Sequence, residues 1–126
     1  MKKKRILIID DEKEMVVLLQ MRLEAADYEI LVSNDGQEGL DKARAEKPDL
    51  ILLDIMIPKM NGYQVCRELK IDNGTKRIPV VMLTAKAQES DKFWGKEVGA
   101  DDYVTKPFEA SELLEKIREL LEVTQK

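Results

Sequence analysis

The sequence predicts an α/β fold in which a doubly wound parallel sheet of five strands carries helices on both faces. Two observations predict it. Short runs at 6–9, 50–53 and 80–83 are apolar without a polar break, which is typical of strands buried on both faces of a parallel sheet. Stretches with helical periodicity separate these runs along the whole chain, and this alternation indicates βαβ units.

The first half of the chain is expected to contain three strands and two helices. The run at 6–9 forms the first strand, and a shorter strand at 28–33 is expected at an edge of the sheet. The helix between them has an apolar stripe of Met15, Leu18, Leu19 and Leu23. A second helix follows the turn at 34–36 and is ended by Pro48, and the third strand, 50–54, ends in Asp54.

The second half continues the same alternation. A helix at 63–70 precedes the fourth strand at 79–84, and a helix at 90–98 precedes the last strand at 102–105. The final helix, at 110–121, has the clearest apolar stripe: Leu113, Leu114, Ile117, Leu120 and Leu121. We expect the strand order 2-1-3-4-5 of flavodoxin-like sheets, with right-handed crossovers.

Length and composition exclude several classes of function. With 126 residues the chain is expected to form one domain, without an output domain. A net charge of −4 argues against a nucleic-acid surface, and no apolar run is long enough to span a membrane. Cys66 is the single cysteine, which fits a reducing, cytoplasmic location.

Polar side chains are expected to meet at the carboxyl edge of this sheet. The first strand brings Asp10 and Asp11, the third brings Asp54, the fourth brings Thr84, and Lys106 follows the fifth. An all-oxygen ligand set with no histidine or thiolate suits Mg²⁺, with Mn²⁺ as an alternative. Together these groups predict the handling of a phosphoryl group, with the carboxylate of Asp54 as the nucleophile.

Each of these residues also has an ordinary structural explanation. Asp54 is in a position typical of a turn residue, Asp10 and Asp11 could cap the first helix, Thr84 is a common strand former, and Lys106 could lie in a plain loop. What favours a site is that all of them reach one edge of the sheet.

Four segments resemble the receiver domains of bacterial two-component response regulators, of which the chemotaxis regulators are an example. They are Ile-Ile-Asp-Asp-Glu at 8–12, Leu-Leu-Asp-Ile-Met-Ile-Pro at 52–58, Met-Leu-Thr-Ala at 82–85, and Gly-Ala-Asp-Asp-Tyr-Val-Thr-Lys-Pro-Phe at 99–108. The resemblance covers nearly the whole chain. It implies a signalling domain that catalyses only its own phosphorylation and dephosphorylation, and not a turnover enzyme.

The resemblance also implies roles for individual residues. Asp54 would be the phosphoacceptor, and Mg²⁺ would be bound by Asp11, Asp54 and the backbone carbonyl of Met56, with Asp10 acting through water. Thr84 and Lys106 would contact the phosphoryl oxygens. The Lys106–Pro107 peptide bond would be cis, an isomer that proline tolerates.

Regulation is implied in the same way. The phosphoryl group would come from a histidine kinase or phosphotransfer protein, or from acetyl phosphate, because the chain has no ATP-binding glycine motif. Thr84 and Tyr103 would then switch the face made by the fourth helix, the last strand and the last helix, to control a protein target or an output domain. The alternative for Tyr103 is a half-buried residue that only fills space.

The same face carries an expected partner surface. Trp94 marks an interface or, alternatively, part of the core. We expect a monomer. The chain could also dimerise on phosphorylation, because its charges resemble those through which one subfamily forms such a dimer: Lys92, Asp102, Glu112 and Lys116. Lysine stands at two positions where that subfamily has arginine, which forms better bidentate pairs.

Some positions depart from the family pattern or tune it. The loop after the phosphoacceptor has Lys59 and Asn61 where many relatives have glycine and aspartate. Met56 and Lys86 occupy the positions that tune phosphoryl lifetime, and neither activates water, so we hypothesise a long-lived phosphoryl group.

Two other functions compete with the signalling switch. A Mg²⁺-dependent aspartyl-phosphate phosphatase uses similar residues, but it needs an Asp-x-Asp motif where this chain has adjacent aspartates. A receiver-like scaffold that is never phosphorylated would lack a site residue, and none is missing. The sequence leaves open the kinase, the target and whether the chain is free-standing.

Overall fold

The computed structural model describes residues 2–84 and 99–124, with only the backbone of Thr84 and Thr124 included. The helix predicted at 90–98 lies outside the described residues. The elements in chain order are β1 (Arg5–Ile9), α1 (Lys13–Ala25), β2 (Glu29–Ser33), α2 (Gly36–Glu46), β3 (Leu50–Asp54), α3 (Gly62–Ile71), β4 (Val80–Thr84), β5 (Asp102–Thr105) and α5 (Ala110–Thr124).

The five strands form one parallel sheet in the order β2-β1-β3-β4-β5, which confirms the predicted order. The register places Ile9 of β1 beside Ser33 of β2 and Leu53 of β3. All five residues of β3 are buried, as the unbroken apolar run predicted. The carboxyl ends of β1 and β3 therefore lie side by side at the centre of one edge of the sheet.

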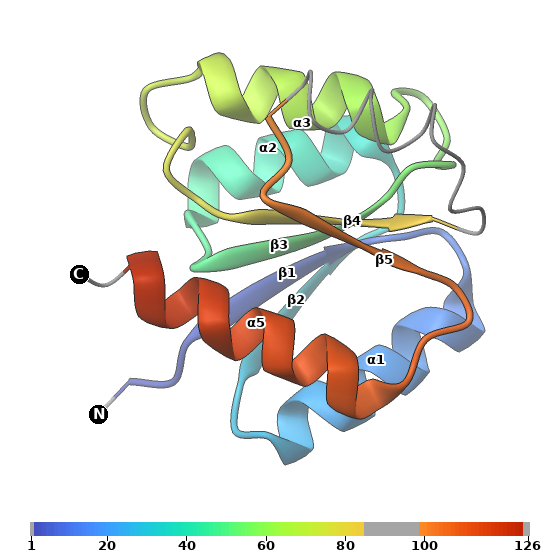
Figure 1. Cartoon of the computed structure of the whole chain (residues 1–126). Coiled ribbons are helices and arrows are strands. Elements are labelled where there is room, and N and C mark those ends of the chain that lie inside the picture. Colours follow the sequence, from blue (N-terminus) through green and yellow to red (C-terminus); the bar gives the residue numbers. More distant parts are fainter. Residues whose placement is uncertain (1, 85–98, 125–126) are drawn as a thin grey trace.

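Helices cover both faces of the sheet, with α1 and α5 on one side and α2 and α3 on the other (Figure 1). Alternate strand residues supply the two cores: Ile6 and Ile8 pack under α1 and α5, while Leu7 and Ile9 pack under α2 and α3. This two-sided burial fixes the register, because a one-residue slip would exchange the two sets of side chains.

The ends of the second and third described helices follow from capping. Asp35 accepts a hydrogen bond from the Glu38 backbone N–H (2.8 Å) at the start of α2, and Lys47 ends that helix with a left-handed φ of 46°. Asn61 and Gln64 form a reciprocal capping box at the start of α3.

The buried face of α1 differs from the predicted stripe. Leu18 was expected in the core but is 46% exposed, whereas Val16, Leu19 and Leu23 are buried. Val17 and Met21 are exposed as well, so this helix is apolar on both sides. Because apolar residues surround the helix, their spacing identified Leu19 and Leu23 as buried but did not distinguish Leu18 from Val16.

At the amino edge of the sheet, opposite the carboxyl ends of β1 and β3, polar contacts join α3, β4 and the segment before β5. The ammonium of Lys70, near the end of α3, donates to the Ile78 carbonyl and to Asp101 Oδ2, both at 2.8 Å. The same carboxylate oxygen accepts the backbone N–H of Val80 at 2.8 Å. The start of β4 and the segment before β5 are thereby fixed to α3.

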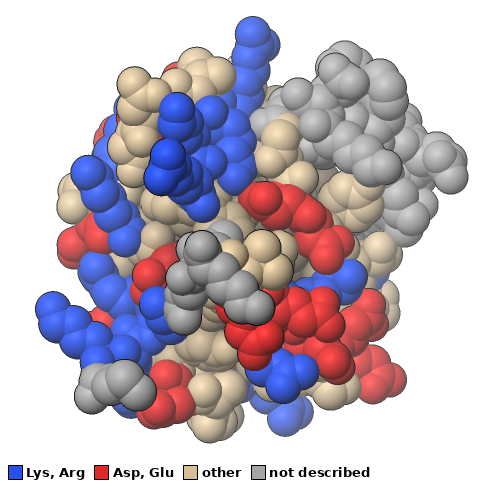
Figure 2. Space-filling model, turned by 60° about the vertical axis from the view of Figure 1, so that its left-hand side comes forward, with Lys and Arg blue, Asp and Glu red and all other residues tan. Residues whose placement is uncertain are grey.

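In the part of the chain that the structure describes, none of the helices has the length and apolar character needed to cross a membrane. Acidic and basic side chains both occur on the face drawn in Figure 2, with basic residues most frequent towards the upper left of the view and acidic residues towards the lower right.

Candidate functional site

Two buried carboxylates lie at the carboxyl edge of the sheet. Asp10 follows β1 and is fully buried, and Asp54 ends β3 with a side chain that is 7% exposed. Asp10 Oδ1 accepts the Glu12 backbone N–H (3.0 Å), and Asp54 Oδ1 accepts the Met56 backbone N–H (3.2 Å). Each aspartate is therefore oriented by one oxygen and keeps the other, Oδ2, for the site.

Lys106 joins these carboxylates. Its Nζ lies 3.3 Å from Asp10 Oδ2, 3.4 Å from Asp54 Oδ2 and 3.4 Å from Glu12 Oε1, and its side chain is 11% exposed. The residue directly follows β5, and its peptide bond to Pro107 is cis. The topology thus brings together three of the residues predicted to share the site.

The charges in this cluster perturb one another. Burial, reinforced by the charge of Asp10, raises the pKa of Asp54 to about 6, although Lys106 acts in the opposite direction. Burial acts to lower the pKa of Lys106, but the charges of Asp54, Asp10 and Glu12 together outweigh it and raise that pKa. The lysine therefore stays an ammonium at neutral pH, beside a carboxyl group that is protonated in mild acid.

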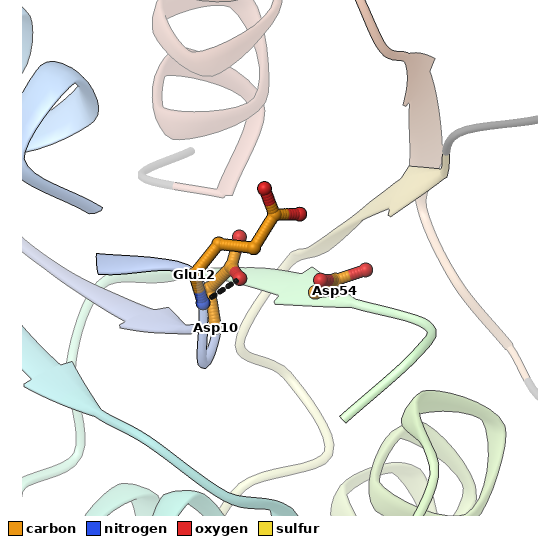
Figure 3. Close-up of side chains that lie close together, drawn as sticks. All are labelled: Asp10, Glu12 and Asp54. Atoms are coloured by element: carbon orange, nitrogen blue, oxygen red, sulfur yellow. Dashed lines mark hydrogen bonds between the residues drawn. The ribbon is translucent and has the colours of Figure 1, made fainter. Parts of the chain in front are cut away.

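The acidic side chains also form a group that could hold a metal ion. Asp10, Glu12 and Asp54 each offer a carboxylate oxygen, and these oxygens all lie within 4.8 Å of one another. Figure 3 shows the side chains of Asp10 and Glu12 next to each other, with Asp54 across from them at the end of β3. Because every donor is a carboxylate oxygen, the group fits a hard cation such as Mg²⁺.

Glu12 is the member of this group that sequence reasoning did not single out. Asp11, which was expected to bind the cation directly, is exposed and does not belong to the group. A detectable signal for Glu12 is its position: it occupies the N-cap of α1, where serine, threonine, aspartate or asparagine is preferred.

The loop after Asp54 is held closely against the neighbouring helices. The Gly62 N–H donates to the Ile55 carbonyl (2.9 Å), and a Cβ on this glycine would lie 2.6 Å from the Asp54 carbonyl oxygen. Lys59 has a left-handed φ of 69°, a conformation that favours glycine, and it forms a 3.4 Å ion pair with Asp35. Met56, expected to offer its carbonyl to a cation, is 79% exposed.

The two predicted switch residues end up on adjacent strands. Thr84 is the last residue of β4 and lies beside Thr105 of β5, while its side chain is outside the described part of the structure. Tyr103 is half-buried in β5 and packs against the core under α2 and α3.

The predicted interface residues are only partly described. Lys92 and Trp94 lie outside the described residues, as does Lys86. Asp102 and Lys116 form an ion pair within the chain (3.2 Å), and Glu112 is exposed in the first turn of α5.

Comparison with known proteins identifies the relatives of the chain. The family model of the response regulator receiver domain matches residues 6–118. The alkaline phosphatase synthesis transcriptional regulatory protein PhoP of Bacillus subtilis is 48% identical over 118 residues, which are 94% of this chain and 48% of PhoP. Protein PilH of Pseudomonas aeruginosa is 44% identical over 93% of this chain and 97% of PilH.

Solved structures give the same result. A putative response regulator from Chloroflexus aurantiacus has a TM-score of 0.92 and 35% identity, covering 95% of this chain and 98% of that one. The receiver domain of the sensor histidine kinase PA1611 from Pseudomonas aeruginosa, which carries a magnesium ion in its active-site cleft, has a TM-score of 0.89 and 27% identity, with coverage of 95% and 98%.

The chain spans about half the length of the first curated regulators that it matches, such as PhoP, and nearly all of PilH. The relatives include proteins named as transcriptional regulators, such as PhoP, and a CheY-like response regulator receiver domain protein from Methanospirillum hungatei. On this evidence the chain belongs to the response regulator receiver domain family.

Proposed function

We propose that this chain is a phosphorylation switch that accepts a phosphoryl group on Asp54 and passes the signal to a protein partner. The observation that carries the proposal is the contact of one ammonium, Lys106, with the carboxylates of Asp10 and Asp54 at 3.3 and 3.4 Å. A carboxylate can act as the nucleophile, and a neighbouring cation can stabilise the negative charge that develops on the transferred group.

The reaction follows from the roles of these groups. An ionised oxygen of Asp54 attacks phosphorus, the bond to the nitrogen of a phosphohistidine or to the acyl oxygen of acetyl phosphate breaks, and that group leaves with the electron pair. A pKa of about 6 leaves Asp54 mostly ionised at pH 7, so the nucleophile is available. Lys106 is placed to offset charge on the phosphoryl oxygens, and the Thr84 hydroxyl is proposed to do the same.

A divalent cation is part of the proposal. Asp11, Asp54 and the Met56 carbonyl would hold Mg²⁺, with Asp10 acting through water, and the cation supplies positive charge against the phosphoryl oxygens when bound. The carboxylate group formed by Asp10, Glu12 and Asp54 supports such a cation site.

The output is proposed to be a change in the surface around β5 and α5. Thr84 and Tyr103 would respond to the phosphoryl group, and the half-buried ring of Tyr103, which packs against the core under α2 and α3, would take a second arrangement. Tyr103→Ala is expected to abolish the gain in partner affinity on phosphorylation. Unchanged affinity would remove this ring from the mechanism.

The partners are proposed from chemistry and from the relatives. A histidine kinase or phosphotransfer protein would donate the phosphoryl group, in the cytoplasm, and residues 1–126 would act as one domain. The receiving partner is a separate protein or an output domain. Phosphorylation could also produce a dimer, through Lys92, Trp94, Glu112 and the Asp102–Lys116 pair. Light scattering of the phosphorylated protein tests this, and finding only monomer would exclude the dimer.

The central test is phosphate incorporation. The wild-type chain, incubated with acetyl phosphate and Mg²⁺, should gain one phosphoryl group by intact-mass measurement, and peptide mapping should locate it on Asp54. Asp54→Asn should gain none, and a chelator should suppress the reaction. Absence of incorporation in the wild type, or its persistence in Asp54→Asn, would contradict the proposal.

A further inference from the structure

Glu12 stands where a helix cap would be expected, but it does not cap. Its backbone has the extended N-cap conformation at the start of α1, and its side chain makes no capping hydrogen bond. The carboxylate instead lies 3.4 Å from Lys106 Nζ, a residue 94 positions away. Glu12 therefore contributes no capping stability to α1 and contacts the site instead.

The contacts of Lys106 leave no free donor among the described residues. An ammonium has three N–H donors, and Lys106 faces three carboxylates, those of Asp10, Glu12 and Asp54. A phosphoryl oxygen can therefore bind this ammonium only if one carboxylate gives up its place.

The three carboxylates differ in how firmly they are held. Asp10 and Asp54 are buried, with side chains 0% and 7% exposed, and each is fixed by a backbone N–H. Glu12 is 62% exposed and reaches Lys106 on a longer side chain from the solvent side. It is the partner that yields most readily, and it also presents a negative charge to any anion that enters.

We propose that Glu12 is a positioning residue for Lys106. The Glu12 carboxylate competes with the phosphoryl oxygens for the Lys106 ammonium, and this competition slows phosphorylation by small anionic donors. The inference rests on the proposed function of the site and adds a control on access to it. A donor whose binding energy comes from a protein interface can displace Glu12 at little cost, whereas a small anion has only its own charge with which to compete.

The test compares phosphorylation rates at saturating Mg²⁺, determined separately for each variant, with acetyl phosphate well below saturation. Glu12→Gln keeps the size of the side chain and the backbone hydrogen bonds but removes the charge. Its rate is expected to rise about two- to fivefold, the equivalent of an exposed ion pair. The ratio of variant to wild-type rate should fall towards one as ionic strength increases.

Two further variants separate this role from a structural one. Glu12→Asp has a side chain too short for Lys106 but suited to capping α1, so it should raise the melting temperature and still accelerate phosphorylation. Glu14→Gln removes an exposed acidic charge from the first turn of the same helix, and its rate should equal that of the wild type.

The outcomes are distinct. A Glu12→Gln rate equal to or below the wild-type rate would overturn the proposal. So would a wild-type rate in Glu12→Asp, because charge without contact would then suffice, or an acceleration in Glu14→Gln equal to that in Glu12→Gln. Failure of the wild type itself to incorporate phosphate would instead contradict the proposed function.

Discussion

The ammonium of Lys106 lies 3.4 Å from Asp54 Oδ2, although 52 residues separate the two in the chain. This contact offsets only part of the cost of a charge at the end of β3. Burial and the neighbouring Asp10 still raise the pKa of Asp54 to about 6. The fold therefore holds a carboxylate in a place where ionisation is unfavourable.

Asp54→Asn is expected to stabilise the protein at pH 7 in the presence of a chelator. A raised carboxyl pKa means that the folded state binds more protons than the unfolded state between 3.8 and about 6, so wild-type stability falls as pH rises through this window. Removing the charge should add about 1–3 kcal/mol at pH 7. The raised pKa of Lys106 acts only at alkaline pH and does not overlap this range.

Urea unfolding at several pH values checks this expectation. The stability difference between Asp54→Asn and wild type should grow between about pH 4 and pH 6 and stay constant above it. A difference independent of pH would show that Asp54 has an ordinary pKa in the folded state.

Mg²⁺ is expected to raise the melting temperature of the wild-type protein. A cation that binds only the folded state at a hundred times its dissociation constant adds about 2.7 kcal/mol of stability. Asp10→Asn should lose most of this shift, while Glu14→Gln, an exposed acid in α1, should keep it. A thermal scan with and without Mg²⁺ measures both, and equal shifts in both variants would count against the assigned ligands.

Gly62→Ala is expected to disturb the site through the backbone. Its Cβ would lie 2.6 Å from the Asp54 carbonyl oxygen and 2.7 Å from Ile55 Cα, so α3 must move away from the end of β3. We expect a loss of about 1–3 kcal/mol in denaturant unfolding. Gly74→Ala is the matched control, because its nearest contact would be 3.4 Å away, and its stability should change by less than about 0.5 kcal/mol.

Removing either of two buried hydroxyls should have different effects on stability. Among the described residues, the buried Ser33 hydroxyl has no hydrogen-bond partner, whereas the Thr75 hydroxyl donates to the Leu69 carbonyl at 2.8 Å. Ser33→Ala should leave stability unchanged or raise it by about 1 kcal/mol, and Thr75→Val should lower it by about 1 kcal/mol. Chemical denaturation of both variants checks the pair, and a clear loss in Ser33→Ala would reveal a partner for that hydroxyl.

The fold was predictable because its central strands have a clear sequence pattern. The runs that became β1, β3 and β4 are apolar without interruption, and the rule that parallel strands share one carboxyl edge then brought Asp10, Asp54 and Lys106 together. Convergence of rare polar residues at strand ends is information that a single sequence contains.

The remainder depended on geometry that the sequence does not encode locally. Glu12 is an exposed acid at a helix start, a common arrangement, and only the position of Lys106 distinguishes it. On α1 the sequence placed Leu19 and Leu23 correctly in the core but chose Leu18 instead of Val16, because these two residues are similarly apolar. The raised pKa of Asp54 arises from burial, which no motif reports.

The contact between Lys70 and Asp101 distinguishes the amino end of the sheet from its carboxyl end. At the amino end, one carboxylate oxygen ties the Val80 amide to the ammonium of α3, so that amide should exchange with solvent deuterium very slowly. At the opposite end, three carboxylates gather around the ammonium of Lys106. We therefore expect a change in charge at the carboxyl edge to move the carboxyl ends of the strands more than their amino ends.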